Sequence, residues 1–335
     1  MKINLMPVST LVLLLLFCTI STATALVTMS KSPYSGAIVI DAATGKVLFE
    51  DNADAKGYPA SVTKLMVLLV FLEAIESHHL TLDEPVTVTA EASRIGGSQV
   101  YLKENEVFPV DELLYALIVQ SANDAATALA IHYAGSKEAF VELMNKRAQE
   151  IGMRDTVFHS VHGLPPSKGQ LPDISTPRDI AELCQELLKN ANVLKYTSTK
   201  ERAFRADAAE PFIMMNHNEL LGNMEGCDGF KTGYFSAAGF SIAATATKKD
   251  QRAIAVVFGA VDQKVRDAKA KEILTKGLME LVMNARPPAS ALASDIVQIK
   301  KSTMKTIGAG IGCLMILGFV LFALKNRTRQ NTDMG

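Results

Sequence analysis

Residues 58–66 read YPASVTKLM and place a serine and a lysine three positions apart at the start of an apolar run. A serine hydroxyl is a weak nucleophile until a base takes its proton, and a lysine can be that base only as a free amine. Because residues three apart share one face of a helix, Ser61 and Lys64 would be in contact. Alone, the pattern also fits an ordinary serine N-cap before a buried helix. A second copy at Ser302–Lys305 shows that it is not specific by itself.

Two further short motifs follow, each present once in the chain: SAN at Ser121–Asn123 and KTG at Lys231–Gly233. We expect the first in a turn between two helices and the second on a strand. In the order S-x-x-K, S-x-N, K-T-G, the three motifs form the set that serine β-lactamases and penicillin-binding proteins share. The set predicts acyl transfer through a covalent serine intermediate. The usual alternative, a Ser-His-Asp hydrolase, would require a G-x-S-x-G elbow that the chain does not contain.

The first two motifs are expected to carry the catalytic groups. Ser61 is the predicted nucleophile, and Lys64 is the predicted base. Burial and the nearby cation Lys231 would both favour the free amine of Lys64. Ser121 would relay a proton to the leaving group, and Asn123 would orient Lys64 and the substrate amide.

The third motif is expected to bind the substrate. Thr232 offers a hydroxyl to a substrate carboxylate, and Gly233 removes a side chain where the substrate would lie against a strand edge. The backbone amides of Ser61 and Tyr234 are placed in the sequence so that they could form an oxyanion hole. Together the motifs predict a site that binds a carboxylate and cleaves an acyl bond.

Apolar periodicity predicts strands at both ends of the chain's main body and helices in its middle. In the helix expected at 175–190, Thr176 is the predicted cap and Pro177 the first helical residue. This order predicts an α/β protein of the α+β type, with an antiparallel sheet assembled from the two termini, packed with helices, plus a mostly helical subdomain. The expected elements are a hairpin at 35–52, helices at 61–79, 110–120, 124–135, 175–190 and 265–285, short strands and a loop at 84–108, and a hairpin of strands 239–247 and 252–260.

Two apolar segments stand near the ends of the 335-residue chain. LVLLLLFCTI followed by Ala23-x-Ala25 is typical of a cleaved export signal, with an uncleaved anchor as the alternative; bulky Phe17 disfavours a lipoprotein signal at Cys18. A formal net charge of -1 gives no support for nucleic-acid binding. The predicted organisation is a signal peptide at 1–25, a catalytic domain at 26–285, a linker at 286–305, a transmembrane helix at 306–324 and a cytoplasmic tail at 325–335.

The cysteines and histidines predict neither a metal site nor a cofactor. Cys184 and Cys227, the two cysteines of the predicted exported body, could form one disulfide in an oxidising compartment. His159 and His162 have no third metal ligand nearby, so a structural or surface role is expected for both.

Over residues 34–283 the sequence closely resembles the low-molecular-mass penicillin-binding proteins, the serine-type D-alanyl-D-alanine carboxypeptidases. The resemblance extends beyond the three motifs to SANDAA, AFVELMN, FHSVHGL, STPRDIAEL, NHNELL and DGFKTGY. It implies the serine β-lactamase/DD-peptidase fold. It also implies removal of the terminal D-alanine from peptidoglycan pentapeptide stems through an acyl-enzyme on Ser61, with β-lactams as covalent inhibitors.

The resemblance also implies roles for residues at matching positions, including an arginine that helps hold the terminal carboxylate. The predicted export signal, together with the predicted C-terminal span, places the catalytic domain on the periplasmic (extracytoplasmic) side of the inner cell membrane. The implied catalytic residues are Ser61, Lys64, Ser121 and Asn123, and the implied substrate-binding residues are Lys231, Thr232, Gly233, Tyr234 and Arg266.

The sequence departs from the family pattern in three places. Only about 20 residues separate the last predicted helix from the membrane segment, where many relatives carry a small β-rich domain. A full spanning segment replaces the amphipathic surface helix of many relatives. Tyr234 follows KTG where some members have histidine, so activity relative to those members and penicillin turnover are left open.

Four alternatives use parts of the same pattern. A class A β-lactamase needs a glutamate after S-x-N to activate water, and residues 155–170 contain none. A membrane penicillin sensor would need more than the short tail at 325–335 to pass its signal. An idle peptidoglycan-binding module would not need Ser61, Lys64 and Lys231 intact. An endopeptidase acting on cross-links uses the same site and stays open.

Overall fold

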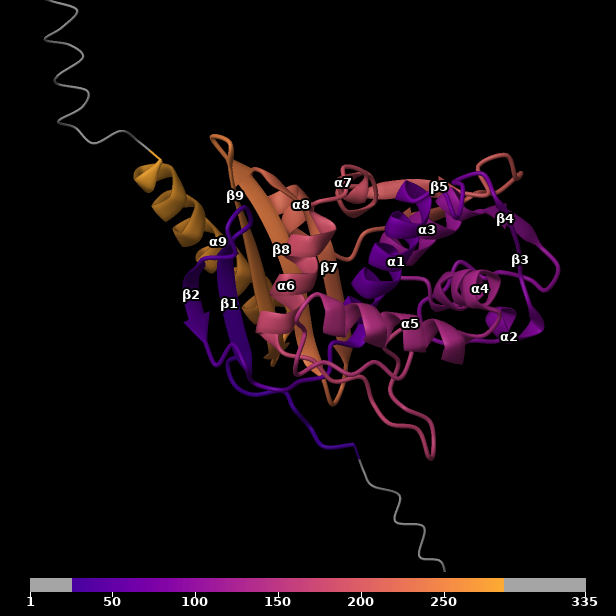
Figure 1. The fold of residues 1–335 in the computed structure, drawn as a ribbon, viewed down its shortest axis with the longest axis horizontal. Helices are drawn as coiled ribbons and strands as arrows, with labels where there is room; N and C mark the ends of the chain where they lie inside the picture. Colours follow the sequence, from indigo (N-terminus) through magenta and orange to yellow (C-terminus); the bar gives the residue numbers. More distant parts are fainter. Residues whose placement is uncertain (1–25, 286–335) are drawn as a thin grey trace, which may run out of the picture. The chain divides into compact units, whose positions relative to one another are not determined.

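The protein's structure, a computed structural model, describes residues 26–285 and has a five-stranded antiparallel sheet. The strand order is β2-β1-β9-β8-β7, so the two ends of the described chain share one sheet, as the sequence predicts. In Figure 1 the indigo strands β1 and β2 lie beside the orange strands β7 to β9. The bounds are Gly36–Asp41 for β1, Val47–Asp51 for β2, Cys227–Phe235 for β7, Gly239–Lys248 for β8 and Gln251–Ala260 for β9.

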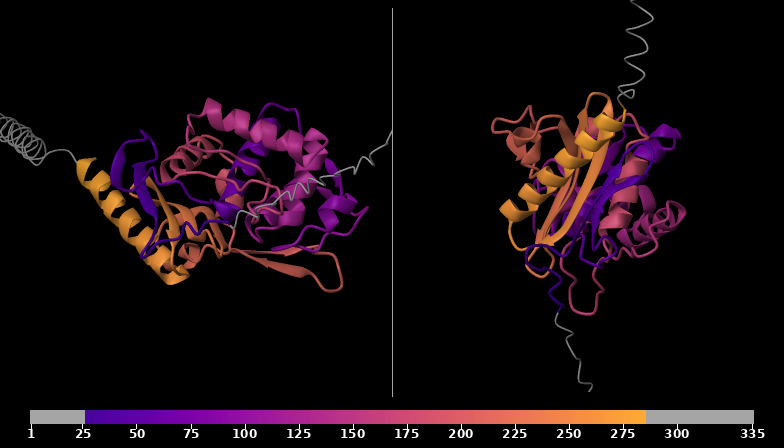
Figure 2. Two further views of the ribbon diagram at one scale, coloured as in Figure 1. Left: turned by 90° about the horizontal axis from the view of Figure 1, so that it is seen from below. Right: turned by 90° about the vertical axis from the view of Figure 1, so that its left-hand side faces the viewer.

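Both faces of the sheet are covered, and strand alternation determines which side chains point to which face. On β1, Ile38 and Ile40 join the main apolar core beneath the helices. Val39 points the other way, where its Cγ1 would be 2.7 Å from a Cβ added at Gly277 in the closing helix α9 (Gln263–Asn284). Figure 2 shows α9 running along one face of the sheet. The chain divides into two compact units after Leu278, and residues 279–285 are the described part of the second unit.

The remaining elements lie between β2 and β7 in the chain. Helix α1 follows directly on a 3₁₀ turn, η1, that carries Ser61. In chain order these elements are η1 (Ala60–Thr63), α1 (Lys64–Glu76), β3 (Pro85–Thr87), α2 (Ala90–Ser93), β4 (Val107–Pro109), α3 (Val110–Ile118), α4 (Asn123–Ala134), α5 (Lys137–Glu150), α6 (Pro177–Leu187), α7 (Val193–Thr197), β5 (Glu201–Phe204), β6 (Phe212–Met215) and α8 (Leu220–Asn223).

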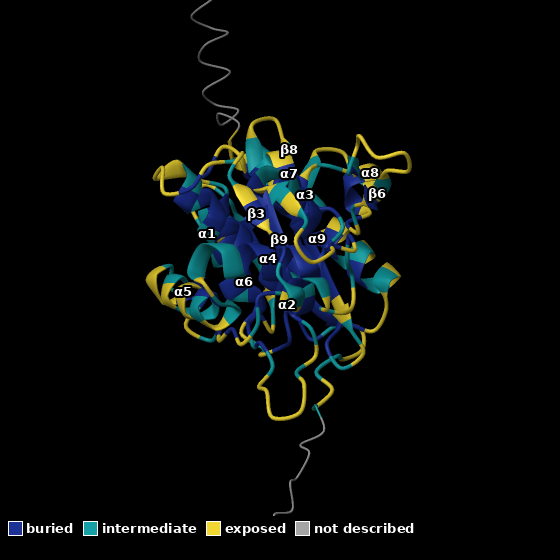
Figure 3. Cartoon of the chain, turned by 90° about the vertical axis from the view of Figure 1, so that its right-hand side faces the viewer, coloured by how far each residue is buried: buried dark blue, intermediate teal, exposed yellow. Residues whose placement is uncertain are grey.

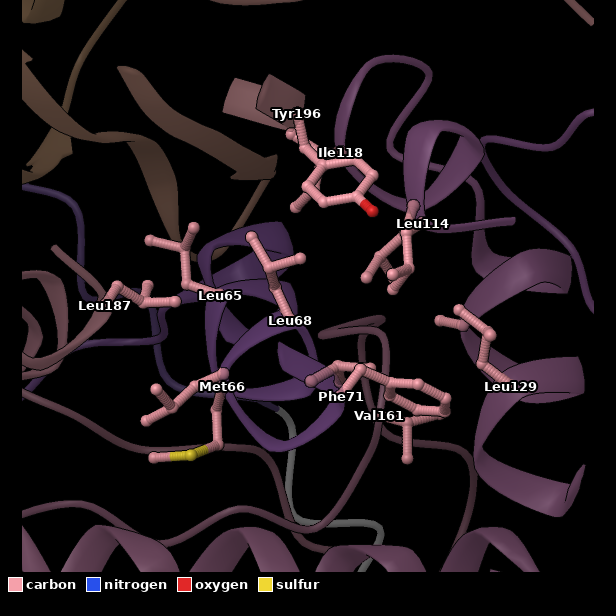
Figure 4. Close-up of a cluster of buried hydrophobic side chains, with 14 of the residues drawn as sticks. Leu65, Met66, Leu68, Phe71, Leu114, Ile118, Leu129, Val161, Leu187 and Tyr196 are labelled. Carbon is pink, nitrogen blue, oxygen red and sulfur yellow. The ribbon is translucent and has the colours of Figure 1, made fainter. Parts of the chain in front are cut away.

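Helix α1 is the centre of the apolar core. Its residues from Lys64 to Leu69 are all buried, which explains a sequence that is apolar nearly all round. In Figure 4, Leu65, Met66, Leu68 and Phe71 point outward from α1 toward side chains of several other segments. Burial on every side fixes the position and rotation of α1, and therefore the direction in which Lys64 leaves its first turn.

Helices α4 and α5 differ in burial, as Figure 3 shows. Every residue of α4 from Asn123 to Ala130 is buried, whereas α5 buries only Phe140, Met144 and Ala148. The four-residue spacing of these three side chains gives α5 a narrow apolar stripe toward the core. Helix α5 was not predicted from the sequence, because a stripe this narrow in a polar segment is a weak signal.

The predicted start of α6 is confirmed. Thr176 Oγ1 accepts a hydrogen bond of 3.1 Å from the backbone N–H of Asp179, and Pro177 is the first helical residue. The prediction of a single helix at 61–79 is partly wrong, because a 3₁₀ turn precedes α1 and the helix ends at Glu76. The short elements α2, α7 and α8 and the β5–β6 hairpin were not predicted.

The structure does not describe the two ends of the chain, but it does describe Cys184 and Cys227. The predicted signal peptide, linker, transmembrane helix and cytoplasmic tail lie outside the described residues. Within residues 26–285, no helix combines the length and the hydropathy that a bilayer crossing requires. Cys184 is buried and Cys227 half-buried, and both are free thiols, so the possible disulfide between them is absent.

Candidate active site

The turn η1 presents Ser61 to a cleft while its neighbours anchor the turn in the core. Ala60, Val62 and Thr63 are buried, and Ser61 is only partly so. Neither η1 nor α1 has a side-chain cap bond, so Ser61 is not the helix cap that its local sequence also allows. Instead, Lys64 Nζ donates a hydrogen bond of 3.0 Å to Ser61 Oγ. The contact expected from the three-residue spacing is therefore present.

The amino group of Lys64 is enclosed by three oxygen acceptors. Besides Ser61 Oγ, it donates to Asn123 Oδ1 at 2.8 Å and to the backbone carbonyl of His162 at 2.6 Å. Lys64 is fully buried. A free amine would keep two N–H donors for Asn123 and His162 and leave a lone pair for the proton of Ser61. The geometry therefore suits Lys64 as a general base.

The charges around Lys64 favour that free amine. Burial and the positive charge of Lys231 hold the pKa of Lys64 well below its ordinary value, although Asp173 and Asp124 act in the opposite direction. Burial and the nearby charge of Arg266 lower the pKa of Lys231 to about 7. The buried positive charge of Lys231 thus disfavours protonation of Lys64.

The S-x-N motif lies at the predicted turn: Ser121 and Ala122 are between α3 and α4, and Asn123 is the first residue of α4. Ser121 has a φ of +61°, the left-handed region, which is unfavourable for a non-glycine residue by on the order of 1–3 kcal/mol. The start of α4 is fixed by two hydrogen bonds from Asn123. Its backbone N–H donates to the carbonyl of Ser98 at 2.7 Å, and its Nδ2 donates to the carbonyl of Gly96 at 2.8 Å. These bonds orient Asn123 Oδ1 toward Lys64 and hold the strained turn in place.

The K-T-G motif lies on β7, an edge strand of the sheet. Lys231 is buried, and its Nζ donates 3.1 Å to the carbonyl of Thr232. A Cβ added at Gly233 would lie 2.5 Å from the carbonyl oxygen of Pro59 and 3.0 Å from the backbone nitrogen of Ser61. The missing side chain of Gly233 lets β7 approach η1, and the prediction that it also makes room for substrate stays a prediction. Tyr234 beyond it is exposed and stacks on Phe240 at 4.1 Å between ring centroids.

These motifs meet in one cleft of about 580 Å³. Its walls come from η1, residues 97–98, the turn before α4, residues 163–165, residues 216–219, β7 and the start of α9. Seven of the nine predicted site residues line the cleft, and the other two, Lys64 and Lys231, make hydrogen bonds to residues of that lining. Lys231 is buried behind the lining, within hydrogen-bond distance of the Thr232 carbonyl.

Arg266 lies in α9 and lines the cleft although it is almost fully buried. Its Nε pairs with Asp267 Oδ1 at 2.8 Å. Burial of the ring and the charges of Lys231, Lys64 and Arg266 lower the pKa of His217 to about 4, so its imidazole is neutral at pH 7. A substrate carboxylate in this cleft would be attracted by the positive charges of Lys231 and Arg266 and could accept a hydrogen bond from the hydroxyl of Thr232.

Sequence reasoning missed two contributors to this site. The carbonyl of His162 was not identified because a backbone oxygen has no residue signature, and only a structural or surface role was expected for His162 itself. His217 was overlooked as a lining residue, although both histidines lie in segments, FHSVHGL and NHNELL, that resemble family sequence. Among the residues that the structure describes, no group of three or more His, Cys, Asp or Glu could hold a metal ion.

The chain is similar to a known family and to several known proteins. The family model described as D-alanyl-D-alanine carboxypeptidase matches residues 24–262, which leaves Arg266 just outside the match. The chain is 38% identical over 71% of its length to the D-alanyl-D-alanine carboxypeptidase DacF of Bacillus subtilis, covering 60% of that protein. It is 36% identical over 82% of its length to DacC of Escherichia coli, covering 68%. Ampicillin-bound penicillin-binding protein D2 of Listeria monocytogenes superposes with a TM-score of 0.66 at 29% identity, over 73% of this chain and 97% of that one.

Proposed function

Because this chain belongs to the D-alanyl-D-alanine carboxypeptidase family, we propose that it is a serine DD-carboxypeptidase that removes the terminal D-alanine from peptidoglycan pentapeptide stems. The chain spans only about 60% of the length of DacF, so the proposal rests on the site itself. The observation that carries it is the buried amine of Lys64, 3.0 Å from Ser61 Oγ and enclosed by Asn123 and His162.

In the proposed reaction, Ser61 Oγ attacks the carbonyl carbon of the penultimate D-alanine while Lys64 Nζ takes the hydroxyl proton. The C–N bond to the last residue then breaks, and the hydroxyl of Ser121 relays a proton to the departing amine. Water hydrolyses the resulting ester, which releases the shortened stem and restores Ser61. A β-lactam would acylate Ser61 in the same way, but its opened ring stays attached because the amine that leaves the carbonyl is part of the same molecule.

Binding of the terminal carboxylate would place the scissile bond over Ser61. Thr232 and Arg266 line the cleft, and Lys231 adds positive charge behind it. The backbone N–H groups of Ser61 and Tyr234 would stabilise the oxyanion, since β7 approaches η1 closely at Gly233. The free edge of β7 offers the substrate backbone a strand to pair with.

One of the alternatives is further weakened by the cleft. Its lining contains a single carboxylate among the described residues, Glu219, which already accepts a hydrogen bond of 2.7 Å from Gln263. Residues 155–170 contain no glutamate that could activate the deacylating water of a class A β-lactamase. A carboxypeptidase therefore accounts for the site better than a β-lactamase does.

Release of D-alanine from a diacyl-Lys-D-Ala-D-Ala tripeptide tests the proposed function. The purified protein should release one D-alanine per peptide, and mass spectrometry should find a penicilloyl adduct on the protein. A protein that takes up penicillin but releases no D-alanine would instead be a non-turnover penicillin acceptor. Hydrolysis of a cross-linked dimer in the absence of D-alanine release would indicate an endopeptidase.

The rate should depend on pH in opposite directions on either side of neutrality. Lys64 acts as a base only when deprotonated. Because its pKa is lowered, kcat/KM should increase with rising pH on the acid side of neutrality. Lys231 attracts carboxylate only when protonated, so kcat/KM should fall by about tenfold as pH rises through about 7. Lys231→Arg should shift this fall in kcat/KM to higher pH, because arginine stays protonated. A profile of kcat/KM that is flat from pH 6 to 9 in the wild type would contradict this assignment.

We also propose that residues 26–285 form the complete catalytic domain, exported by the segment before it and held at the extracytoplasmic face of the membrane by the segment after it. The three motifs lie within residues 26–285, and the described residues of this range by themselves form a cleft around them. A protein truncated after Ala285 should therefore be soluble, with unchanged turnover of the diacyl tripeptide. Misfolding or lost turnover would show that later residues belong to the domain.

A further inference from the structure

Asp173 is a buried carboxylate that the proposed reaction does not use. It precedes α6, and its side chain accepts four hydrogen bonds, all from uncharged donors. Oδ1 accepts from the backbone N–H groups of His159 at 2.6 Å and Ser160 at 2.9 Å. Oδ2 accepts from the hydroxyls of Ser160 at 2.9 Å and Thr63 at 3.0 Å. A carboxylate with this many fixed donors is held in one position.

The four donors belong to two segments that both touch the catalytic lysine. Thr63 lies between Ser61 and Lys64 on η1, so its hydroxyl is attached to the turn that carries the nucleophile. His159 and Ser160 begin the loop that ends in the carbonyl of His162, the acceptor 2.6 Å from Lys64 Nζ. Asp173 therefore joins the turn to the loop through side-chain bonds at a position that faces neither solvent nor the cleft.

Two further contacts hold the rest of this loop, residues 160–163, against η1. The hydroxyl of Ser160 accepts a hydrogen bond of 2.8 Å from the backbone N–H of Gly163. A Cβ added at Gly163 would overlap the carbonyl oxygen of Ala60, so this part of the loop lies directly against η1. The carbonyl of His162 lies between these two fixed points, and its distance from Lys64 depends on both.

We propose that Asp173 is a positioning residue for the catalytic lysine. Through Thr63 and Ser160 it sets the distance between η1 and the loop, and thereby keeps the His162 carbonyl in place as a fixed acceptor for Lys64. With one N–H directed to His162 and another to Asn123, the remaining position on Nζ points to Ser61 Oγ. This inference rests on the proposed function, because it takes Lys64 as the base.

The bond between Thr63 and Asp173 can be removed separately from the rest of the network. Thr63→Val has nearly the same shape and removes one donor, while Asp173 retains its charge and the bonds from His159 and Ser160. We expect the second-order rate of acylation by a fluorescent penicillin to fall by about tenfold, as loss of a hydrogen bond to a charged group implies. For the diacyl tripeptide, kcat should fall while KM changes by less than about twofold.

Thr245→Val is the matched control. The hydroxyl of Thr245 is equally buried on β8 and lies outside the cleft lining; it donates 2.9 Å to the carbonyl of Ala253 and accepts 3.1 Å from the charged Arg252 Nη1. This variant should lose thermal stability as Thr63→Val does, yet acylate at the wild-type rate. An acylation rate for Thr63→Val within twofold of wild type, or equal losses in both variants, would overturn the proposal.

Asp173→Asn provides a second route if Thr63→Val does not fold. The amide oxygen can still accept from the two backbone N–H groups, but the NH₂ group can only donate, so the hydroxyls of Thr63 and Ser160 would have to turn into acceptors and the bonds to a charged oxygen are lost. Acylation should again slow by about tenfold, and an unchanged rate would overturn the proposal. The acylation rate separates this inference from the proposed function, since a wild type that takes up penicillin without releasing D-alanine would contradict only the latter.

Discussion

Ser61→Ala should abolish both penicillin labelling and D-alanine release while leaving the fold intact. The hydroxyl of Ser61 accepts a hydrogen bond from Lys64 Nζ, and it makes no cap bond that the helix needs. Because the variant lacks the nucleophile, we expect activity to fall by on the order of 10⁴-fold or more, to the background of the assay. Mass spectrometry after incubation with penicillin and the D-alanine assay measure the two losses.

Thermal unfolding of the Ser61→Ala variant serves as the control for its fold. Ser61 is partly exposed and packs little apolar surface, so the melting temperature should change by no more than a few degrees. A penicilloyl adduct that persists in the folded variant would contradict Ser61 as the nucleophile. Peptide mapping of that adduct would then identify the serine involved.

Lys64→Arg and Lys231→Arg should have very different effects, although both keep the positive charge. Arginine cannot act as a base near neutral pH, and Lys64 is fully buried with its amino group already bonded to three oxygen acceptors, which a larger planar guanidinium would disturb. We therefore expect Lys64→Arg to lower the acylation rate by about 10³-fold, with a smaller change in substrate affinity. Lys231→Arg should lose only about tenfold, because its expected role is to supply positive charge.

The two variants are measured side by side by acylation rate and by KM for the diacyl tripeptide. Their contrast is the decisive result, since Lys64 and Lys231 are both fully buried and both have lowered pKa values. Equal losses in acylation would contradict the division of roles. A KM effect confined to Lys64→Arg would reverse it.

The sequence by itself determined much of the architecture. Strand periodicity at both ends of the chain predicted the antiparallel sheet, and the Thr176–Pro177 pair predicted the start of α6. The three short motifs predicted which residues meet, because their chemistry makes sense only in combination. These features were readable because local periodicity, capping and side-chain type are written in neighbouring residues.

Only the tertiary structure decided how the cleft holds those residues. The acceptor for Lys64 on His162 is a backbone carbonyl 98 positions away, and no residue type encodes such a group. The need for a glycine at position 233 also comes from its contact with η1, which lies 170 or more positions earlier in the chain. Likewise, Asp173 looks like any loop aspartate until its contact with Thr63 is seen. Each of these depends on the packing of distant segments around α1, which sequence periodicity predicts as burial but not as a distance.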